Sequence, residues 1–218
     1  MARYCGFNLI VLMLIHYEVR AQNNNSQDYY KVISFGEKID FGHIDQTVIW
    51  TVANAEKNLY STLRGNEINA YAFQEPGVYD ITFQESKKHD DACTHDSFPD
   101  RFRVKVEPVK ITFDFSKITF SEPIVRGRNY SDLIITVPAK ISSRENNAVK
   151  LPMPGMSIAG IGVALTGAAV EKEIMAGNTT KLMKYKLSGI VNQETYLMFD
   201  FYDFNNQVQT YNLPQVIK

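Results

Sequence analysis

The sequence has no long run of charged residues of one sign. Its 218 residues include 23 Lys and Arg and 24 Asp and Glu, which gives a formal net charge of −1 at pH 7. Chains that bind nucleic acid or anionic membranes carry basic patches or clusters. The even mixture of signs therefore predicts no nucleic-acid partner and gives no reason to expect attraction to an anionic membrane.

Cysteine is also scarce, because only Cys5 and Cys93 are present. Cys5 belongs to a segment with the features of a secretory signal peptide: Arg3, an apolar run over residues 6–15 and a Val-Arg-Ala ending at Ala21. We expect residues 1–21 to be cleaved on export, which leaves Cys93 alone. An intramolecular disulfide is then impossible, so packing must hold the fold together.

No helical periodicity of useful length follows the signal segment. Short runs rich in β-branched and aromatic residues, separated by Gly, Asn or Asp, are typical of β-strands. After a polar linker at residues 22–30, the chain is therefore predicted to be all-β. The expected strands are at residues 32–35, 38–41, 47–52, 68–73, 78–83, 101–106, 109–115, 118–120, 133–137, 183–187, 196–202 and 207–211.

A Pro-Gly turn that leads into an alternating strand marks a corner of a β-sandwich. Pro76 presets φ for the turn, and Gly77 supplies a positive φ. Tyr79 then stands two residues before the apolar Ile81, as in the tyrosine corner of immunoglobulin-like sandwiches. Trp50, the only Trp in the chain, lies in a strand of the kind that buries such a residue in the core.

The Trp50 strand followed by Tyr71-Ala72-Phe73-Gln74-Glu75-Pro76-Gly77-Val78-Tyr79-Asp80-Ile81-Thr82-Phe83 resembles the polycystic-kidney-disease (PKD) domains of bacterial surface proteins. The resemblance covers residues 31–107. It departs from that family after Trp50, where Thr51-Val52-Ala53-Asn54 replaces the usual Phe-Gly-Asp-Gly turn, so a general immunoglobulin-like domain is the alternative. The resemblance implies a spacer or adhesion module and not an enzyme.

Pro108 is the predicted domain boundary, because proline ends the preceding strand ladder and the alternation restarts at once. We therefore expect two tandem immunoglobulin-like β-sandwiches, at residues 31–108 and 109–218. Residues 133–141 and 176–189 are similar in style to accessory immunoglobulin-like domains of exported Bacteroidota proteins. That similarity implies a bacterial cell envelope.

The candidate binding site is the polar segment 87–100, which is too long for an ordinary hairpin connection. Its candidate residues are His89, Asp90, Asp91, Cys93, His95 and Asp96. Zinc would suit the His and Cys side chains with one Asp, although the spacing matches no structural-zinc motif. A Cys-His nucleophile, a solvated loop, and pairing of Cys93 with a second chain are the other interpretations. No cofactor is predicted, and the metal question stays open.

Familiar catalytic motifs are absent from the sequence. There is no Gly-x-Ser-x-Gly, no His-Glu-x-x-His and no phosphate-binding glycine loop ahead of a helix. Two pairs of acidic residues could in principle act in glycoside hydrolysis: Glu171 with Glu173, and Asp200 with Asp203. Nothing in the sequence places either pair in one cleft. We therefore predict that the protein is not an enzyme.

The predicted function is a non-enzymatic binding or structural component of a bacterial envelope or surface assembly, with another envelope or surface protein as partner. The protein is expected in the periplasm, on the outer-membrane surface or outside the cell. Residues 156–170, apolar but small, are either a buried central strand or a contact surface. The alternative function is a carbohydrate-binding module in which Tyr60, Tyr130, Tyr202 and Tyr211 stack on sugar rings, and the third is a metal- or thiol-dependent enzyme centred on Cys93.

Overall fold

The computed structural model describes residues 29–85, 101–145 and 148–218. The prediction of an all-β chain is confirmed, since α1 has only four residues. Among the described residues, no helix has the length and apolar character needed to cross a membrane. The elements are β1 (Tyr29–Ser34), β2 (Ile49–Asn54), β3 (Leu59–Arg64), α1 (Glu67–Ala70), β4 (Gly77–Gln84), β5 (Phe102–Glu107), β6 (Val109–Phe113), the 3₁₀ turn η1 (Phe115–Lys117), β7 (Thr119–Phe120), β8 (Asn129–Ser143), β9 (Val149–Pro152), β10 (Met156–Ala159), β11 (Val163–Ala169), β12 (Glu173–Ala176), β13 (Thr179–Val191), β14 (Met198–Tyr202) and β15 (Val208–Asn212).

The first half is built on one five-stranded sheet in the order β1-β5-β4-β2-β3. β1 runs parallel to β5, and the other neighbours are antiparallel. One face buries a core, and α1 together with irregular chain covers that core from the other side. The buried residues contributed by this covering layer are Ile39, Ile44, Ile68 and Phe73.

The strands expected at residues 38–41 and 68–73 are wrong. Residues 68–73 begin in α1, and Phe73 N donates to Glu37 O at 3.0 Å. Near residues 38–41, side-chain amides satisfy backbone groups in place of a neighbouring strand. Asn69 Oδ1 accepts from Phe41 N at 2.9 Å while its Nδ2 donates to Gly42 O at 2.7 Å. Asn66 Oδ1 accepts from Ile44 N at 2.7 Å. These bonds satisfy three backbone groups of the irregular segment that lies over the core.

The predicted corner is confirmed. Tyr79 is 1% exposed, and its hydroxyl donates to Glu75 O at 2.9 Å. Gly77 has φ +130°, a value that L side chains rarely adopt. Trp50 is also 1% exposed, and its indole N–H donates to Gly65 O at 3.1 Å, so it belongs to the core as expected.

The second half has a four-stranded path, β11-β13-β8-β6, with β7 beside β8, and a separate sheet in the order β10-β14-β15. A small ribbon pairs β12 with β9. Phe199 and Phe201 of one sheet and Tyr185 of the other belong to the same buried core. At one edge the Gln209 amide joins the two sheets: its Oε1 accepts from Phe113 N at 3.1 Å, and its Nε2 donates to Ile111 O at 2.9 Å.

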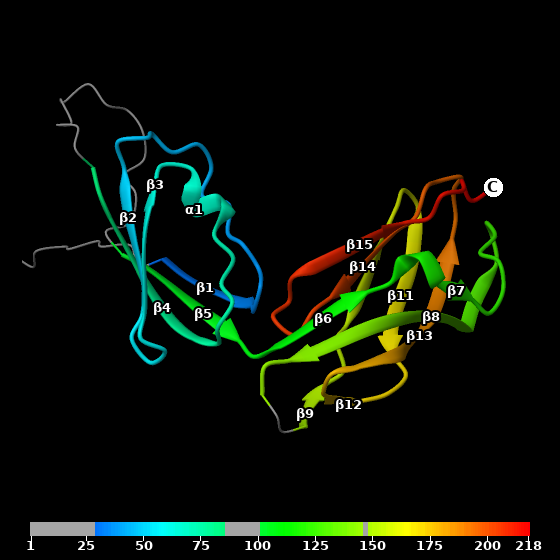
Figure 1. The fold of residues 1–218 in the computed structure, drawn as a ribbon. Helices are drawn as coiled ribbons and strands as arrows, with labels where there is room; N and C mark the ends of the chain where they lie inside the picture. Colours follow the sequence, from blue (N-terminus) through cyan, green and yellow to red (C-terminus); the bar gives the residue numbers. More distant parts are fainter. Residues whose placement is uncertain (1–28, 86–100, 146–147) are drawn as a thin grey trace, which may run out of the picture.

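The two halves appear as separate lobes in Figure 1. Their buried residues form two clusters with no member in common. Ile111 pairs with Ile141 of β8, and Val104 pairs with Lys31 and Tyr79, so the sheets do not run on from β5 to β6. Independent folding on either side of Pro108 stays a prediction.

Two buried tyrosines should respond to the loss of their hydroxyls in opposite directions. Tyr79→Phe removes the bond to Glu75 O and should lower the free energy of unfolding by about 1 to 3 kcal/mol. The Tyr185 hydroxyl is buried and has no hydrogen-bond partner among the described residues, and burial raises the pKa of that phenol. Tyr185→Phe should therefore raise stability, by up to about 1 kcal/mol. Urea unfolding of both variants checks the signs, and equal shifts would contradict the assignment.

Candidate functional site

Two shallow hollows lie at the end of the second half that is opposite Pro108. One, of about 420 Å³, is lined by Ile118, Thr119, Phe120, Ser121, Glu122, Pro123, Ile124, Leu213 and Gln215. The other, of about 440 Å³, is lined by Ala159, Gly160, Tyr196, Leu197, Met198, Asn212 and Leu213. Leu213 belongs to both walls, so the hollows adjoin.

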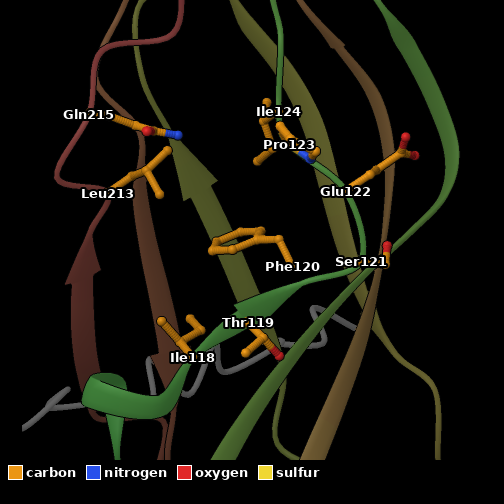
Figure 2. Close-up of a pocket in the computed structure, with 9 residues that line it drawn as sticks. All are labelled: Ile118, Thr119, Phe120, Ser121, Glu122, Pro123, Ile124, Leu213 and Gln215. Carbon is orange, nitrogen blue, oxygen red and sulfur yellow. The ribbon is translucent and has the colours of Figure 1, made fainter.

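The first hollow lies between two segments. One is β7 with the chain after it, and the other is the chain that follows β15. Figure 2 shows Phe120, Ile118 and Leu213 around the opening, with Glu122 directed away from it. Tyr130 fixes the outer wall, because its hydroxyl donates to Pro123 O at 3.0 Å and accepts from Val125 N at 2.8 Å. The first hollow is therefore mainly apolar and has a hydrogen-bonded rim.

The rim also carries an ion pair. Arg128 pairs with Glu122, and the Arg128 guanidinium lies 5.1 Å from the centre of the Tyr130 ring. A guanidinium over an aromatic face is attracted to the ring as well as to the carboxylate. Glu122 thus lines the first hollow with its carboxylate directed away from it and paired with Arg128.

The second hollow is surrounded by exposed apolar side chains, which we call the distal patch: Ala159, Gly160, Ile161, Tyr196 and Met198. Ile161 is 72% exposed and Tyr196 is 68% exposed. Ladder pairing sets Ala159 beside Met198. A Cβ on Gly160 would lie 2.7 Å from Tyr196 O, so this close approach of the two segments requires glycine.

Hydrogen bonds fix the turn that displays Ile161. Ile161 N donates to Thr195 Oγ1 at 3.0 Å, and Thr195 forms an isolated bridge with Ile217. Gly162 takes φ +66° in the same turn. None of the patch residues is charged, so the patch can contact another surface mainly by burying apolar area.

The interpretation of residues 156–170 as one buried central strand is wrong. The segment forms β10 and β11, which are edge strands of different sheets, and residues 160–162 connect them. The alternative interpretation, a contact surface, still applies to residues 160–162, because Ile161 is exposed. Gly160 and Gly162 are the sequence signal that could have placed the turn.

The sugar-stacking alternative is not supported by where its tyrosines lie. Tyr130 is 4% exposed, and Tyr211 is half-buried against Phe115 and Phe199. Tyr60 is exposed on β3 of the first half, whereas Tyr202 is half-buried on β14 of the second. The four rings share no common face, so the predicted stacking platform is wrong.

The sequence-predicted site residues lie outside the described part of the chain. These are His89, Asp90, Asp91, Cys93, His95 and Asp96. In the sequence they fall between β4 and β5, which pair with each other. Within the described ranges, no group of three or more His, Cys, Asp or Glu is arranged to hold a metal ion. The binding role of the segment stays a prediction.

In comparisons with known proteins, no family model and no curated protein matches the chain. Among solved structures, the chain is similar to the Yersinia pseudotuberculosis adhesin InvE, with a TM-score of 0.26 and 9% sequence identity. The match covers 87% of this chain and 56% of the adhesin chain, so this chain spans little more than half of that structure. We infer nothing about activity or partners from a likeness at this level.

Proposed function

We propose that the protein is a non-enzymatic binding component of a bacterial envelope or surface assembly and that the distal patch holds its protein partner. The exposure of Ile161 and Tyr196 beside two apolar hollows is the observation that supports this proposal. Contiguous exposed apolar side chains mark interaction sites in soluble proteins. Tyrosine is also among the residues that most often carry binding energy at interfaces.

The export part of this proposal rests on the sequence alone. The resemblance to PKD and accessory immunoglobulin-like domains supports an envelope location, and the apolar run with the Val-Arg-Ala ending supports cleavage after Ala21. Amino-terminal sequencing of the secreted protein checks the cleavage site.

The partner-binding test compares a patch variant with a matched surface variant. A double variant, Ile161→Ser with Tyr196→Ser, should reduce capture of the partner from envelope fractions at least about tenfold, since interface hot spots each contribute about 2 kcal/mol or more. Tyr60→Ser is the control, because Tyr60 is 71% exposed but lies on β3 of the other half. Quantitative mass spectrometry of the captured proteins measures the loss.

A third variant separates the distal patch from the segment predicted by the sequence. Replacement of residues 87–96 by a short Asn-Gly turn should leave stability nearly unchanged, because loop length contributes weakly to closure entropy. Under the proposal this variant still captures the partner. Capture lost in the loop variant and kept in the patch variant would move the binding surface to the first half.

A further inference from the structure

The edge strand β3 has one open side. β2 pairs with it along all six residues, and no other strand among the described residues pairs with its second side. Both faces of the strand are accessible, because Tyr60 is 71% exposed on one face and Leu59 is 37% exposed on the other. An unpaired strand edge is a template to which another strand can add.

The hydrogen bonds at the end of β3 show which backbone groups lie on the open side. Arg64 N does not bond β2 but donates to Glu67 Oε2 at 2.7 Å, whereas Gly65 N donates to the chain just before β2 at 2.9 Å. In an antiparallel ladder, successive residues direct their backbone N–H and C=O groups to alternate sides. Arg64, Thr62 and Tyr60 therefore direct theirs to the open side. No described residue bonds these backbone groups of Thr62 or Tyr60.

β3 lacks the features that usually protect a strand edge. It contains no Pro and no Lys, and its pairing with β2 has no bulge. Two other edge strands are met by side-chain amides: Gln207 Nε2 donates to Val32 O of β1 at 3.3 Å, and the Gln209 amide bonds two backbone groups of β6. Within the described ranges, the open side of β3 is met only at its last residue, by Glu67.

We propose that two copies of this chain associate through β3, in antiparallel orientation about a two-fold axis between their Thr62 residues. Such pairing joins two five-stranded sheets into one continuous sheet. An axis perpendicular to the sheet keeps the two cores on the same side. A two-fold contact requires only that one surface be complementary to itself.

The alternation of backbone groups determines the register of this pairing. Hydrogen-bonded partners must both come from the outward residues, so Thr62 opposes the partner's Thr62, and Tyr60 opposes the partner's Arg64 on each side of the axis. An axis at any other residue of β3 leaves at least one outward residue of each strand beyond the end of the other. Tyr60 N donates to the partner's Arg64 O, so Glu67 can keep its bond to Arg64 N.

The side chains that meet in this register are complementary. Tyr60, Thr62 and Arg64 share the face of the sheet opposite that of the buried Trp50, which pairs with Leu63. On the shared face each Tyr60 ring lies opposite the partner's Arg64 guanidinium, an attractive cation–π pair, and the two threonines meet at the axis. No like charges oppose each other among these pairs. A second copy of this chain therefore matches the edge in backbone and in side chains.

The contact is a strand edge and not a broad surface, so the association should be weak. Interfaces that bury less than about 1,200 Å² are typical of transient complexes. We expect a monomer–dimer equilibrium that is visible in concentrated solution and largely dissociated in dilute solution. Dilute capture experiments, and the use of Tyr60→Ser in them, are therefore unaffected.

Sedimentation equilibrium of the full mature chain tests the proposal, with a reductant present so that Cys93 cannot link two copies. The weight-average mass should rise with concentration towards that of a dimer. Thr62→Pro removes an N–H that the dimer uses and β2 does not, so it should abolish the rise while the far-ultraviolet circular dichroism is retained. Thr62→Val is the matched control: it keeps that N–H and should dimerise with a Kd within about threefold of the parent's.

Charge at residue 60 tests the register. Tyr60→Arg sets a like charge opposite the partner's Arg64, whereas Tyr60→Glu sets an opposite charge there. At low salt, Tyr60→Arg should therefore dimerise at least about fivefold more weakly than Tyr60→Glu, since the pair occurs twice in the dimer. Equal or reversed affinities overturn the proposal, and this comparison decides alone should Thr62→Pro fail to fold.

The distal-patch variant, Ile161→Ser with Tyr196→Ser, separates this contact from the proposed partner site. It should dimerise as the parent protein does, because both residues belong to the other half. Loss of the dimer in this variant would place the contact on the distal patch and overturn the proposal. A protein that stays monomeric at every concentration, or a dimer that persists in Thr62→Pro, overturns it equally.

Discussion

Gly189→Ala is expected to lower the free energy of unfolding by about 3 to 5 kcal/mol, a large part of the stability of an ordinary domain. Gly189 lies in β13, the strand between β11 and β8, where the register shifts between Leu187 and Gly189. Its φ is +118°, and a Cβ there would stand 1.9 Å from Ala164 O of the neighbouring strand. A backbone atom cannot move aside as a flexible side chain can, so β11 would have to separate from β13.

Gly177→Ala is the matched control for that substitution. Gly177 lies in the turn between β12 and β13, and a Cβ there would have no neighbour within 4 Å. Its replacement should change stability by no more than about 0.5 kcal/mol. Urea unfolding of both variants checks the pair, and a midpoint for Gly189→Ala close to that of Gly177→Ala would show that β11 does not press against β13 at this point.

Local sequence patterns of turns and strands predicted two core residues of the first half. Trp50 and Tyr79 are both buried as their positions in the sequence indicate, because a fixed turn followed by strict alternation determines which side chains face inward. The alternation of apolar and polar residues does not predict the structure where side chains, in place of a neighbouring strand, bond the backbone. Asn66 and Asn69 accept backbone hydrogen bonds from residues more than 20 positions away, and no local pattern shows this.

The edge strand β3 is missed for a related reason. Its sequence, Leu59-Tyr60-Ser61-Thr62-Leu63-Arg64, has no buried residue in the structure, so the contrast between two faces that marks a half-buried strand is weak. β3 is a strand because β2 pairs with it along its whole length. A pairing partner, and not an amphipathic pattern, determines this element.

The distal patch could not be assembled from the sequence. Ile161 comes from a turn within an apolar run, and Tyr196 stands just before a strand more than 30 residues later. The antiparallel register of β10 with β14 and the hydrogen bond from Ile161 N to Thr195 Oγ1 bring the two segments together. The close approach of the two segments requires a glycine at residue 160, and the sequence has one. A side chain on Gly160 would clash with Tyr196 O. A glycine that permits a long-range contact looks the same in sequence as one in a simple turn.

Gly77→Val is expected to destabilise the first half by about 2 to 4 kcal/mol. Two costs combine at this position. A β-branched residue is strained at φ +130°, and its Cβ would lie 2.9 Å from Asn54 Nδ2 and 3.2 Å from Glu56 Oε2. Asn54 is fully buried, and its Oδ1 accepts from Lys57 N at 3.2 Å, so this side chain has little freedom to retreat.

Gly127→Val separates the two costs. Gly127 also has a positive φ, +78°, but a Cβ there would meet nothing within 4 Å, so this variant carries backbone strain alone. Its loss of stability should be about 1 to 2 kcal/mol, smaller than that of Gly77→Val, and the difference measures the crowding at the corner. Thermal unfolding of both variants, with Tyr79→Phe alongside, checks the order. Equal losses at residues 77 and 127 would mean that Asn54 moves away freely, and the corner would then be held by the Tyr79 hydroxyl and the turn without support from β2.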